Sequence, residues 1–294
     1  MLRAAPRRLI VTGDDFGLAL PVNEAVELAH RDGILTTTSL MVSGSAAADA
    51  VERARRLPRL RVGLHVVLVE GRPVLPAERV PDLVDASGEF SCDFVRAGFR
   101  FFFLPAVRRQ LVAEIRAQFE AFAKTGLTLD HVNAHNHMQL HPTVLSSIIS
   151  VGRDFGLAAV RVPYEPPIVS WRASSRAAGR GLLPRAWGSL SLRPWTALVR
   201  ARLGRAGIRC NDFVFGLHDS GAMDESRVLA LAERLPEGVS ELYFHVATGR
   251  CPELDRHTPG YRNEAELAAL VSPRVAEALE RRGVELIAFA DLAK

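Results

Sequence analysis

The alternation of short apolar strands with helical segments is the feature that most constrains this fold. Apolar or β-branched runs at 8–13, 36–42 and 61–69 are interleaved with helical periodicity at 21–31 and 45–57. The pattern continues, with further strands expected at 129–136, 158–162, 212–216, 240–246 and 284–289 and helices at 107–124, 142–155, 225–234 and 264–282. Repeated βα units predict an α/β fold, a distorted (β/α) TIM-like barrel of seven or eight parallel strands.

A doubly wound open sheet is the alternative. No Gly-x-Gly-x-x-Gly sequence follows the first strand, and the turn at 13–17 carries acidic residues where a phosphate would require backbone amides. The barrel is therefore favoured.

Size allows either two ordinary domains or one α/β barrel, and we expect one domain over 1–294. The 294 residues are 48% hydrophobic and 24% charged, which is sufficient for a large core. Two stretches, at about 70–105 and 165–209, interrupt the βα pattern and are expected to be insertions. Apolar runs fall short of the roughly 18 to 20 residues that span a membrane. The basic start lacks the apolar region of a secretory leader, and three dispersed cysteines suit a reducing compartment, so we expect a cytoplasmic protein.

The net charge of +4 does not by itself indicate a nucleic-acid binder. All basic residues except Lys124 and Lys294 are arginine, a bias more typical of genome composition than of phosphate recognition. No nucleic-acid-binding module is recognisable, and we expect no nucleic-acid partner.

Polar residues occur where four of the expected strands end. Asp14 and Asp15 end the first strand, His65 lies in the third, a histidine cluster ends the fourth, and His245 follows near the C-terminus. Each has an ordinary structural explanation, a helix cap for the acids and a hydrogen-bonded core position for a single histidine. Because active sites of parallel α/β folds lie at the carboxyl ends of strands, their common position predicts a site.

The segment 130–141 is the strongest of these signals. With the period of two of a strand, His131, Asn133, His135 and His137 project to one face. Burying several imidazoles is costly unless each has a partner or a metal ligand role. The segment therefore predicts a polar row facing the interior.

One carboxylate and two imidazoles from different strands form a set of three metal ligands that leaves coordination positions open. Such open metal sites are typical of catalysis. A second carboxylate can act as general base and a further histidine as general acid. The adjacent Asp14 and Asp15 permit this division of roles, so the residues predict metal-assisted hydrolysis. A metal-dependent phosphoesterase and a nonenzymatic binding module are the alternatives.

Four motifs together resemble the YdjC-like carbohydrate deacetylases, the family of the chitooligosaccharide deacetylase. These motifs are Thr12–Leu18 with Val22 and Asn23, Val62–His65, His131–Pro142, and Leu242–His245. They occur in the same order over nearly the whole chain. The variant at 133–138 is most similar to the hopanoid-biosynthesis-associated, HpnK-like branch.

The resemblance implies a distorted barrel that removes N-acetyl groups from amino sugars with one divalent metal ion, Mg²⁺ or Zn²⁺. Its ligands would be Asp15, His65 and His135, with Asp14 as base and His245 as acid. We also expect His131, His137 and Asn133 to contact the substrate.

Three positions depart from the family pattern. Asn133 replaces the usual Asp, Asn136 replaces the middle histidine, and Phe244–Val246 replaces Cys-His-Pro while keeping its histidine.

The HpnK-like branch implies an N-acetylglucosaminyl hopanoid glycolipid as substrate, with soluble chitooligosaccharides as the alternative. The stretch 171–209 contains Trp171, Trp187 and Trp195, many arginines and no acidic residue. Such a segment either lies on an anionic membrane surface or is a solvated insertion. The stretch 99–104 either adds an apolar rim or packs in the core. Peripheral contact with the inner membrane surface is thus one expectation.

Overall fold

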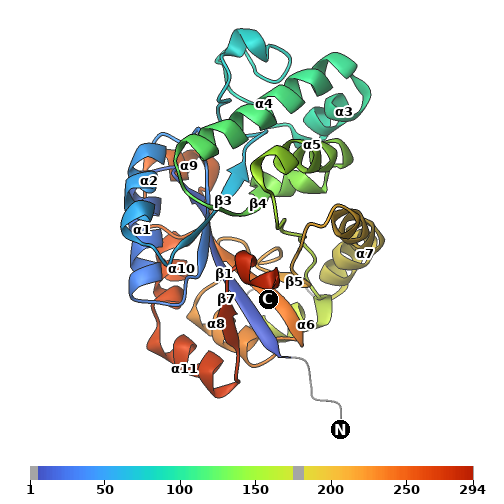
Figure 1. Cartoon of the computed structure of the whole chain (residues 1–294). Helices are drawn as coiled ribbons and strands as arrows, with labels where there is room; N and C mark the ends of the chain where they lie inside the picture. The colour runs from blue at the N-terminus through green and yellow to red at the C-terminus, as the bar shows by residue number, and fades with distance from the viewer. Residues whose placement is uncertain (1–5, 175–181, 294) are drawn as a thin grey trace.

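The structure, a computed structural model, describes residues 6–174 and 182–293, and its centre is a curled parallel sheet (Figure 1). The strand order is β4-β3-β2-β1-β6-β5, and β7 pairs with β1. The strands are β1 (Arg7–Phe16), β2 (Thr37–Leu40), β3 (Arg61–Val66), β4 (Leu129–Ala134), β5 (Phe213–Phe215), β6 (Gly238–Phe244) and β7 (Glu285–Ile287). The α/β class and the parallel sheet are confirmed.

The sheet forms a distorted half-barrel rather than a full TIM barrel. The expected strand at 158–162 makes only isolated parallel bridges, with β4 on one side and Arg209 on the other. Val132 N donates to Ala159 O at 3.0 Å, and Val214 N donates to Tyr164 O at 2.9 Å. A regular ladder stops here because Pro163 has no N–H to donate. These few bonds connect the two edges of the curled sheet.

Helices surround the sheet (Figure 1). They are α1 (Leu20–Arg31), α2 (Ala47–Arg56), α3 (Phe94–Phe103), α4 (Pro105–Lys124), α5 (Pro142–Gly152), α6 (Pro167–Ala173), α7 (Leu182–Arg205), α8 (Glu225–Ala232), α9 (Pro252–His257), α10 (Asn263–Leu270) and α11 (Pro273–Arg281). Short 3₁₀ helices lie at Ala77–Arg79, His135–Leu140, Arg153–Phe155 and Phe289–Ala293. Within the described residues, no helix is long and apolar enough to cross a membrane.

The helix expected over 264–282 is divided into α10 and α11. Pro273 begins α11 and Ser272 caps it, since the Ser272 side chain accepts from Val275 N. A proline has no N–H for the preceding turn and disfavours helical backbone in the residue before it. The break is therefore encoded by the Ser-Pro pair.

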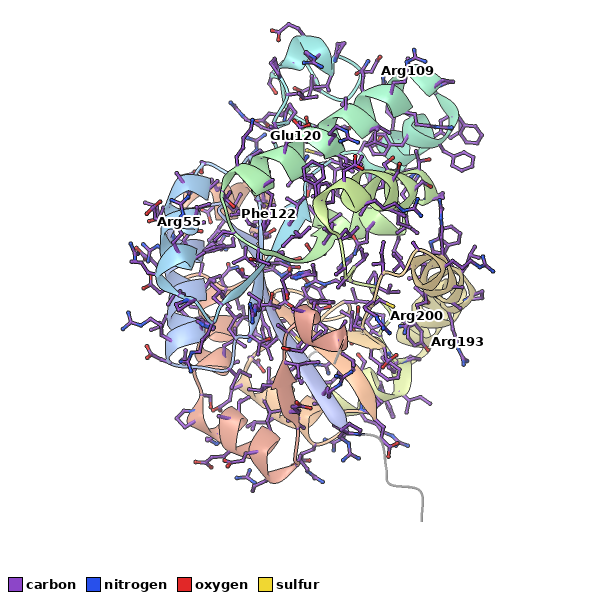
Figure 2. The ribbon with its side chains drawn as sticks, viewed as in Figure 1. Arg55, Arg109, Glu120, Phe122, Arg193 and Arg200 are labelled. Atoms are coloured by element: carbon purple, nitrogen blue, oxygen red, sulfur yellow. The ribbon has the colours of Figure 1, made fainter. Side chains whose placement is uncertain are left out.

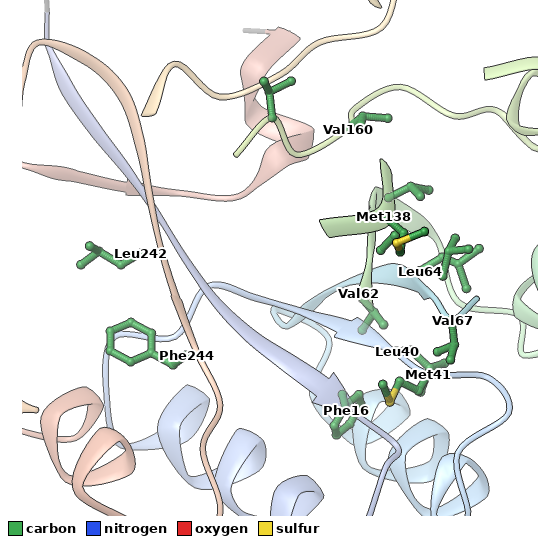
Figure 3. Packing of buried hydrophobic residues seen from close by; sticks show 14 of the residues in the cluster. Phe16, Leu40, Met41, Val62, Leu64, Val67, Met138, Val160, Leu242 and Phe244 are labelled. Atoms are coloured by element: carbon green, nitrogen blue, oxygen red, sulfur yellow. The ribbon is translucent and has the colours of Figure 1, made fainter. Parts of the chain in front are cut away.

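The apolar core lies between the outer face of the sheet and the helices. Phe16, Leu40, Leu64, Leu242 and Phe244 are fully buried members of this cluster (Figure 3). A smaller apolar cluster closes the lower interior of the half-barrel, with Ile10, Ala159, Val239, Ile287 and Phe289. Above it the strands carry buried polar side chains, and these residues form the candidate site.

The two expected insertions hold helices in their described parts. The first contains α3, and the second contains α6 and α7. Their boundaries, and the single-domain organisation, stay predictions.

Candidate active site

Asp15, His65 and His135 meet at the carboxyl ends of β1, β3 and β4. Asp15 Oδ1 lies 3.3 Å from His65 Nε2 and 3.3 Å from His135 Nδ1. The two imidazole nitrogens are also 3.3 Å apart. The sequence-based expectation that these three side chains come together is therefore confirmed, and all three are buried.

A bulge in β1 brings two consecutive acids to this place. The β1–β2 register shifts between Gly13 and Phe16, and Asp15 adopts a left-handed backbone with φ 62°. Asp tolerates this conformation better than most residues. The extra residue of a bulge redirects side chains, so that Asp14 and Asp15 both reach the polar interior instead of alternating between faces.

The cluster fits a divalent cation. Ligand atoms at about 2.1 Å from one ion stand roughly 3.0 to 3.4 Å apart, which matches the three distances. Asp15 Oδ1 is buried and accepts no hydrogen bond from the described residues. Burial lowers the pKa of His135, but the nearby carboxylates of Asp15 and Glu70 outweigh burial and raise that pKa to about 9. The carboxylates of Asp15 and Glu70 thus favour a positive charge beside His135.

Asn133 orients His65. Its Oδ1 lies 2.7 Å from His65 Nδ1. An amide oxygen accepts only, so His65 Nδ1 carries the proton and Nε2 presents a lone pair to the cluster. The Asn133 amide nitrogen donates to Asp14 Oδ1 at 3.1 Å, and Ser39 Oγ donates to the same oxygen at 2.9 Å. Asn133 is thus a positioning residue, and its expected contact with substrate stays a prediction.

Asp14 is held by Arg161, a residue that the sequence analysis missed. Arg161 Nη1 donates to Asp14 Oδ2 at 2.6 Å and Nη2 to Oδ1 at 2.9 Å. Burial raises the pKa of Asp14, but the guanidinium of Arg161 outweighs it and keeps the pKa well below its usual range. Arg161 also donates to Glu241 Oε1 at 2.6 Å. A charged residue inside the apolar run 158–162 was the available signal.

His245 reaches the same site from the end of β6. Its Nε2 lies 4.0 Å from Asp15 Oδ2, and its Nδ1 lies 3.4 Å from Ser220 Oγ. The His245 backbone N–H donates to Glu266 Oε2 at 2.6 Å, which fixes the peptide. The placement agrees with the role expected for His245, which stays a prediction.

A cavity of about 280 Å³ contains these groups. It is lined by Asp14, Asp15, His65, Glu70, Phe94, Ala134, His135, Asn136, His137, Leu217, Ser220, Tyr243, His245, His257, Thr258 and Tyr261. Sequence reasoning missed Glu70, Tyr243 and Tyr261. Tyr243 lies on β6 two residues before His245, so strand periodicity was an available signal.

His137 and His131 occupy different environments. The strand expected over 129–136 ends at Ala134, and Asn136 and His137 have φ of 53° and 54°, which ends the alternation of faces. His137 lines the cavity, 3.3 Å from Tyr243 OH, and burial together with Arg161 lowers its pKa to about 3. His131 lies deeper, with Nδ1 2.9 Å from Asp130 and its ring stacked on Phe289. Their expected substrate contacts stay predictions.

The sequence matches the family profile described as YdjC-like protein over residues 8–281. The chain belongs to the YdjC-like family. A carbohydrate deacetylase from Geobacillus stearothermophilus is 29% identical over 98% of this chain and 99% of its own length. One from Mus musculus is 32% identical over 98% of this chain and 96% of its own length.

Another relative matches over a shorter region. The carbohydrate deacetylase from Brevibacillus brevis is 36% identical over 54% of this chain, and the match spans 59% of that relative's length. A crystal structure from Enterococcus faecalis V583, named for cellobiose-phosphate cleavage, is 26% identical. It superimposes with a TM-score of 0.76 over 98% of this chain and 99% of that chain. The similarity therefore covers the whole fold.

Proposed function

We propose that this YdjC-like protein is a metal-dependent carbohydrate N-deacetylase that removes the acetyl group from an N-acetylated amino sugar and releases acetate and the free amine. The observation that carries the proposal is the three-atom cluster of Asp15, His65 and His135 beside Asp14 and His245 in one cavity. Carbohydrate deacetylases among the full-length relatives support the reaction type.

Asp15, His65 and His135 would hold the ion, Mg²⁺ or Zn²⁺. Once bound, it would act as a Lewis acid on the acetamide carbonyl and lower the pKa of a nearby water. Asp14 stays ionised because it is paired with Arg161, and it acts as the base by accepting a proton from the attacking water. His245 acts as the acid, because an amide nitrogen leaves poorly unless it is protonated.

One group of three or more side chains with metal-ligand geometry is present among the described residues. A phosphoesterase of this type commonly uses a second metal, so the single group favours deacetylation over phosphate-ester hydrolysis.

For the substrate we propose an N-acetylglucosaminyl hopanoid glycolipid, with soluble chitooligosaccharides as the alternative. A second cavity of about 250 Å³ shares His137 and Leu217 with the catalytic cavity. Its other lining residues are mainly apolar and include Leu140, Pro163 and Leu192. A glycolipid would place its sugar in the polar catalytic cavity and its first apolar groups in the second cavity. The lining residues that the two cavities share therefore support a glycolipid substrate.

A cytoplasmic location with peripheral contact to the inner membrane surface through 171–209 also belongs to the proposal. Trp171 is 43% exposed, which suits such contact. Trp195 is partly buried and donates from Nε1 to Leu140 O at 2.8 Å. The side chain of Trp187 lies outside the described residues.

The test is mass spectrometry of N-acetylglucosaminyl hopanoid and of chitooligosaccharides after incubation with metal-replete protein. We expect loss of one acetyl group and stoichiometric acetate, with no phosphate release from phosphate esters. His245→Ala should lower kcat by about 10² to 10⁴-fold at unchanged metal content. Metal-loaded protein that cleaves none of these acetyl groups would refute the proposal.

A further inference from the structure

The first insertion presents an exposed apolar helix face. On α3, the exposed fractions are 84% for Val95, 62% for Phe99, 46% for Phe102 and 57% for Phe103. The ring centroids of Phe99 and Phe103 are 4.4 Å apart, and those of Phe102 and Phe103 are 4.9 Å apart. The large side chains thus touch one another and form a continuous patch. Soluble proteins rarely expose such patches unless they bind something.

The patch is not an unfinished part of the core. The opposite face of α3 is packed, since Ala97 and Phe101 are buried in the main apolar cluster. The helix is also capped at its start, where the Asp93 side chain accepts from Arg96 N. A helix that is well anchored on one side holds its aromatic residues in solvent on the other, so the exposure is a property of the fold.

Four arginines lie on or close to α3. The sequence from 94 to 113 contains four arginines and no Asp or Glu. Arg100 pairs with Asp82, but Arg96, Arg108 and Arg109 have no ion pair with any carboxylate in the described part of the chain. All three are exposed, and Arg109 lies at the outer side of the α3–α4 region (Figure 2). The combination of aromatic and cationic surface suits a bilayer with anionic lipids.

A cavity beside the patch adds a place for headgroups. It has a volume of about 450 Å³ and lies where α3, α4, α5 and α7 meet, with Phe102 at its edge. Arg108 and Arg202 line it together with Ser146, whose Oγ accepts from Arg202 Nη2 at 2.7 Å. Guanidinium and hydroxyl groups are common ligands of phosphate oxygens. Basic groups and an apolar edge therefore occur on the same side of the molecule.

We propose that α3 docks on an anionic phospholipid bilayer, inserting Phe99, Phe102 and Phe103 among the acyl chains while Arg108 and Arg202 face the phosphates. Phe94, the first residue of α3, lines the catalytic cavity. Docking through α3 would therefore place the helix that contributes Phe94 to that cavity at the membrane surface. This docking proposal rests on α3 and its neighbours alone, and vesicle binding is measured without turnover. Docking can therefore be refuted while the deacetylase proposal holds, and the deacetylase proposal can be refuted while docking holds.

Charge favours a bilayer over a second copy of this chain. A two-fold symmetric dimer through α3 would place Arg96, Arg108 and Arg109 of one copy, for which no ion pair is found in the described residues, near those of the other. Like charges at an interface repel, whereas anionic headgroups would neutralise them.

The test is co-sedimentation of the full chain with vesicles of phosphatidylcholine alone or mixed with phosphatidylglycerol. We expect binding to the mixed vesicles that weakens at high salt. The double variant Phe99→Glu and Phe103→Glu should reduce the partition coefficient by about tenfold or more, because carboxylates would have to enter the interface. Leu28→Glu, at an exposed position on α1, is the matched control and should bind as the wild type does.

A second variant separates the headgroup contact from apolar insertion. Arg108→Gln with Arg202→Gln should remove the preference for phosphatidylglycerol. Light scattering checks the mass of the protein in solution, and circular dichroism checks the folding of each variant. Equal binding to both kinds of vesicle, binding unaffected by the glutamates, or a dimer that the glutamates dissociate would each overturn the proposal.

Discussion

Arg161 and Asp14 form a two-point ion pair in the interior of the curled sheet, with nitrogen–oxygen distances of 2.6 and 2.9 Å. Both side chains are buried, and Glu241 shares the same guanidinium at 2.6 Å. One cation therefore compensates two buried carboxylates. The ion pair keeps Asp14, the proposed general base, ionised and fixes the orientation of its carboxylate.

Replacing the cation should be strongly destabilising. Arg161→Met leaves Asp14 and Glu241 buried without a counter-charge, and we expect a loss of about 3 to 5 kcal/mol in the free energy of unfolding. Urea denaturation at pH 7 measures it. The exposed Arg109→Met is the control and should change stability by no more than about 0.5 kcal/mol. A loss as small as that of the control would contradict the role given to Arg161.

The pH dependence of stability should report the lowered pKa of Asp14. A carboxyl group whose pKa is lower in the folded state stabilises the protein above its unfolded pKa, about 3.9. That stabilisation is lost as pH falls through the folded pKa. Asp14→Asn lacks the titrating group. The difference in unfolding free energy between wild type and variant should be constant from pH 8 to 5 and diminish below about pH 4. A difference that begins to shrink above pH 6 would argue against a lowered pKa.

Loss of either imidazole should abolish metal binding. His65→Ala and His135→Ala each leave two of the three ligands. Elemental analysis after dialysis against Mg²⁺ or Zn²⁺ should find less than about one-tenth of the wild-type metal content, because the removal of one ligand weakens metal affinity. Asp14→Asn should keep its metal while losing turnover. Unchanged metal content in the histidine variants would reject the assigned ligands.

Two substitutions of Asn133 should separate its two contacts. Asn133→Ala removes the acceptor for His65 Nδ1 and should weaken metal affinity by about 10 to 100-fold. Asn133→Asp keeps an acceptor for His65 but replaces the amide donor to Asp14 with a second carboxylate. Metal titration should therefore show nearly normal affinity in Asn133→Asp, with kcat reduced. The opposite order of metal affinities would show that His65 is oriented by another group.

Gly63 should not tolerate a side chain. A Cβ there would lie 2.5 Å from two ring atoms of His131 and 2.7 Å from its carbonyl oxygen, which is backbone and cannot rotate away. Gly63→Ala should cost about 1 to 3 kcal/mol in unfolding free energy. Gly204→Ala, in helix α7 with open space around it, should be neutral or stabilising by up to about 1 kcal/mol. Thermal or urea unfolding of both variants provides the comparison.

Local sequence patterns were sufficient to predict several strands and helices and the cluster of candidate metal ligands. The apolar runs predicted β1 to β4 near their observed positions, and strand-end polarity brought Asp15, His65 and His135 into one hypothesis. Such predictions succeed because parallel strands aligned by hydrogen bonds must end at one edge. The predicted continuation of β4 to Asn136 was wrong, because two residues with positive φ turn the chain into a 3₁₀ helix.

By itself, then, the amino-acid order indicated most of the strands, which of them end in ligand-type side chains, and what chemistry such a set supports. Tertiary structure alone decided what surrounds those side chains. Arg161 reaches Asp14 across 147 positions of chain, and the aromatic face of α3 remains in solvent because other residues fill the core beneath it. Periodicity describes neighbours along a strand or helix, whereas the ionisation of a buried acid and the exposure of a helix face depend on which distant segments pack against them.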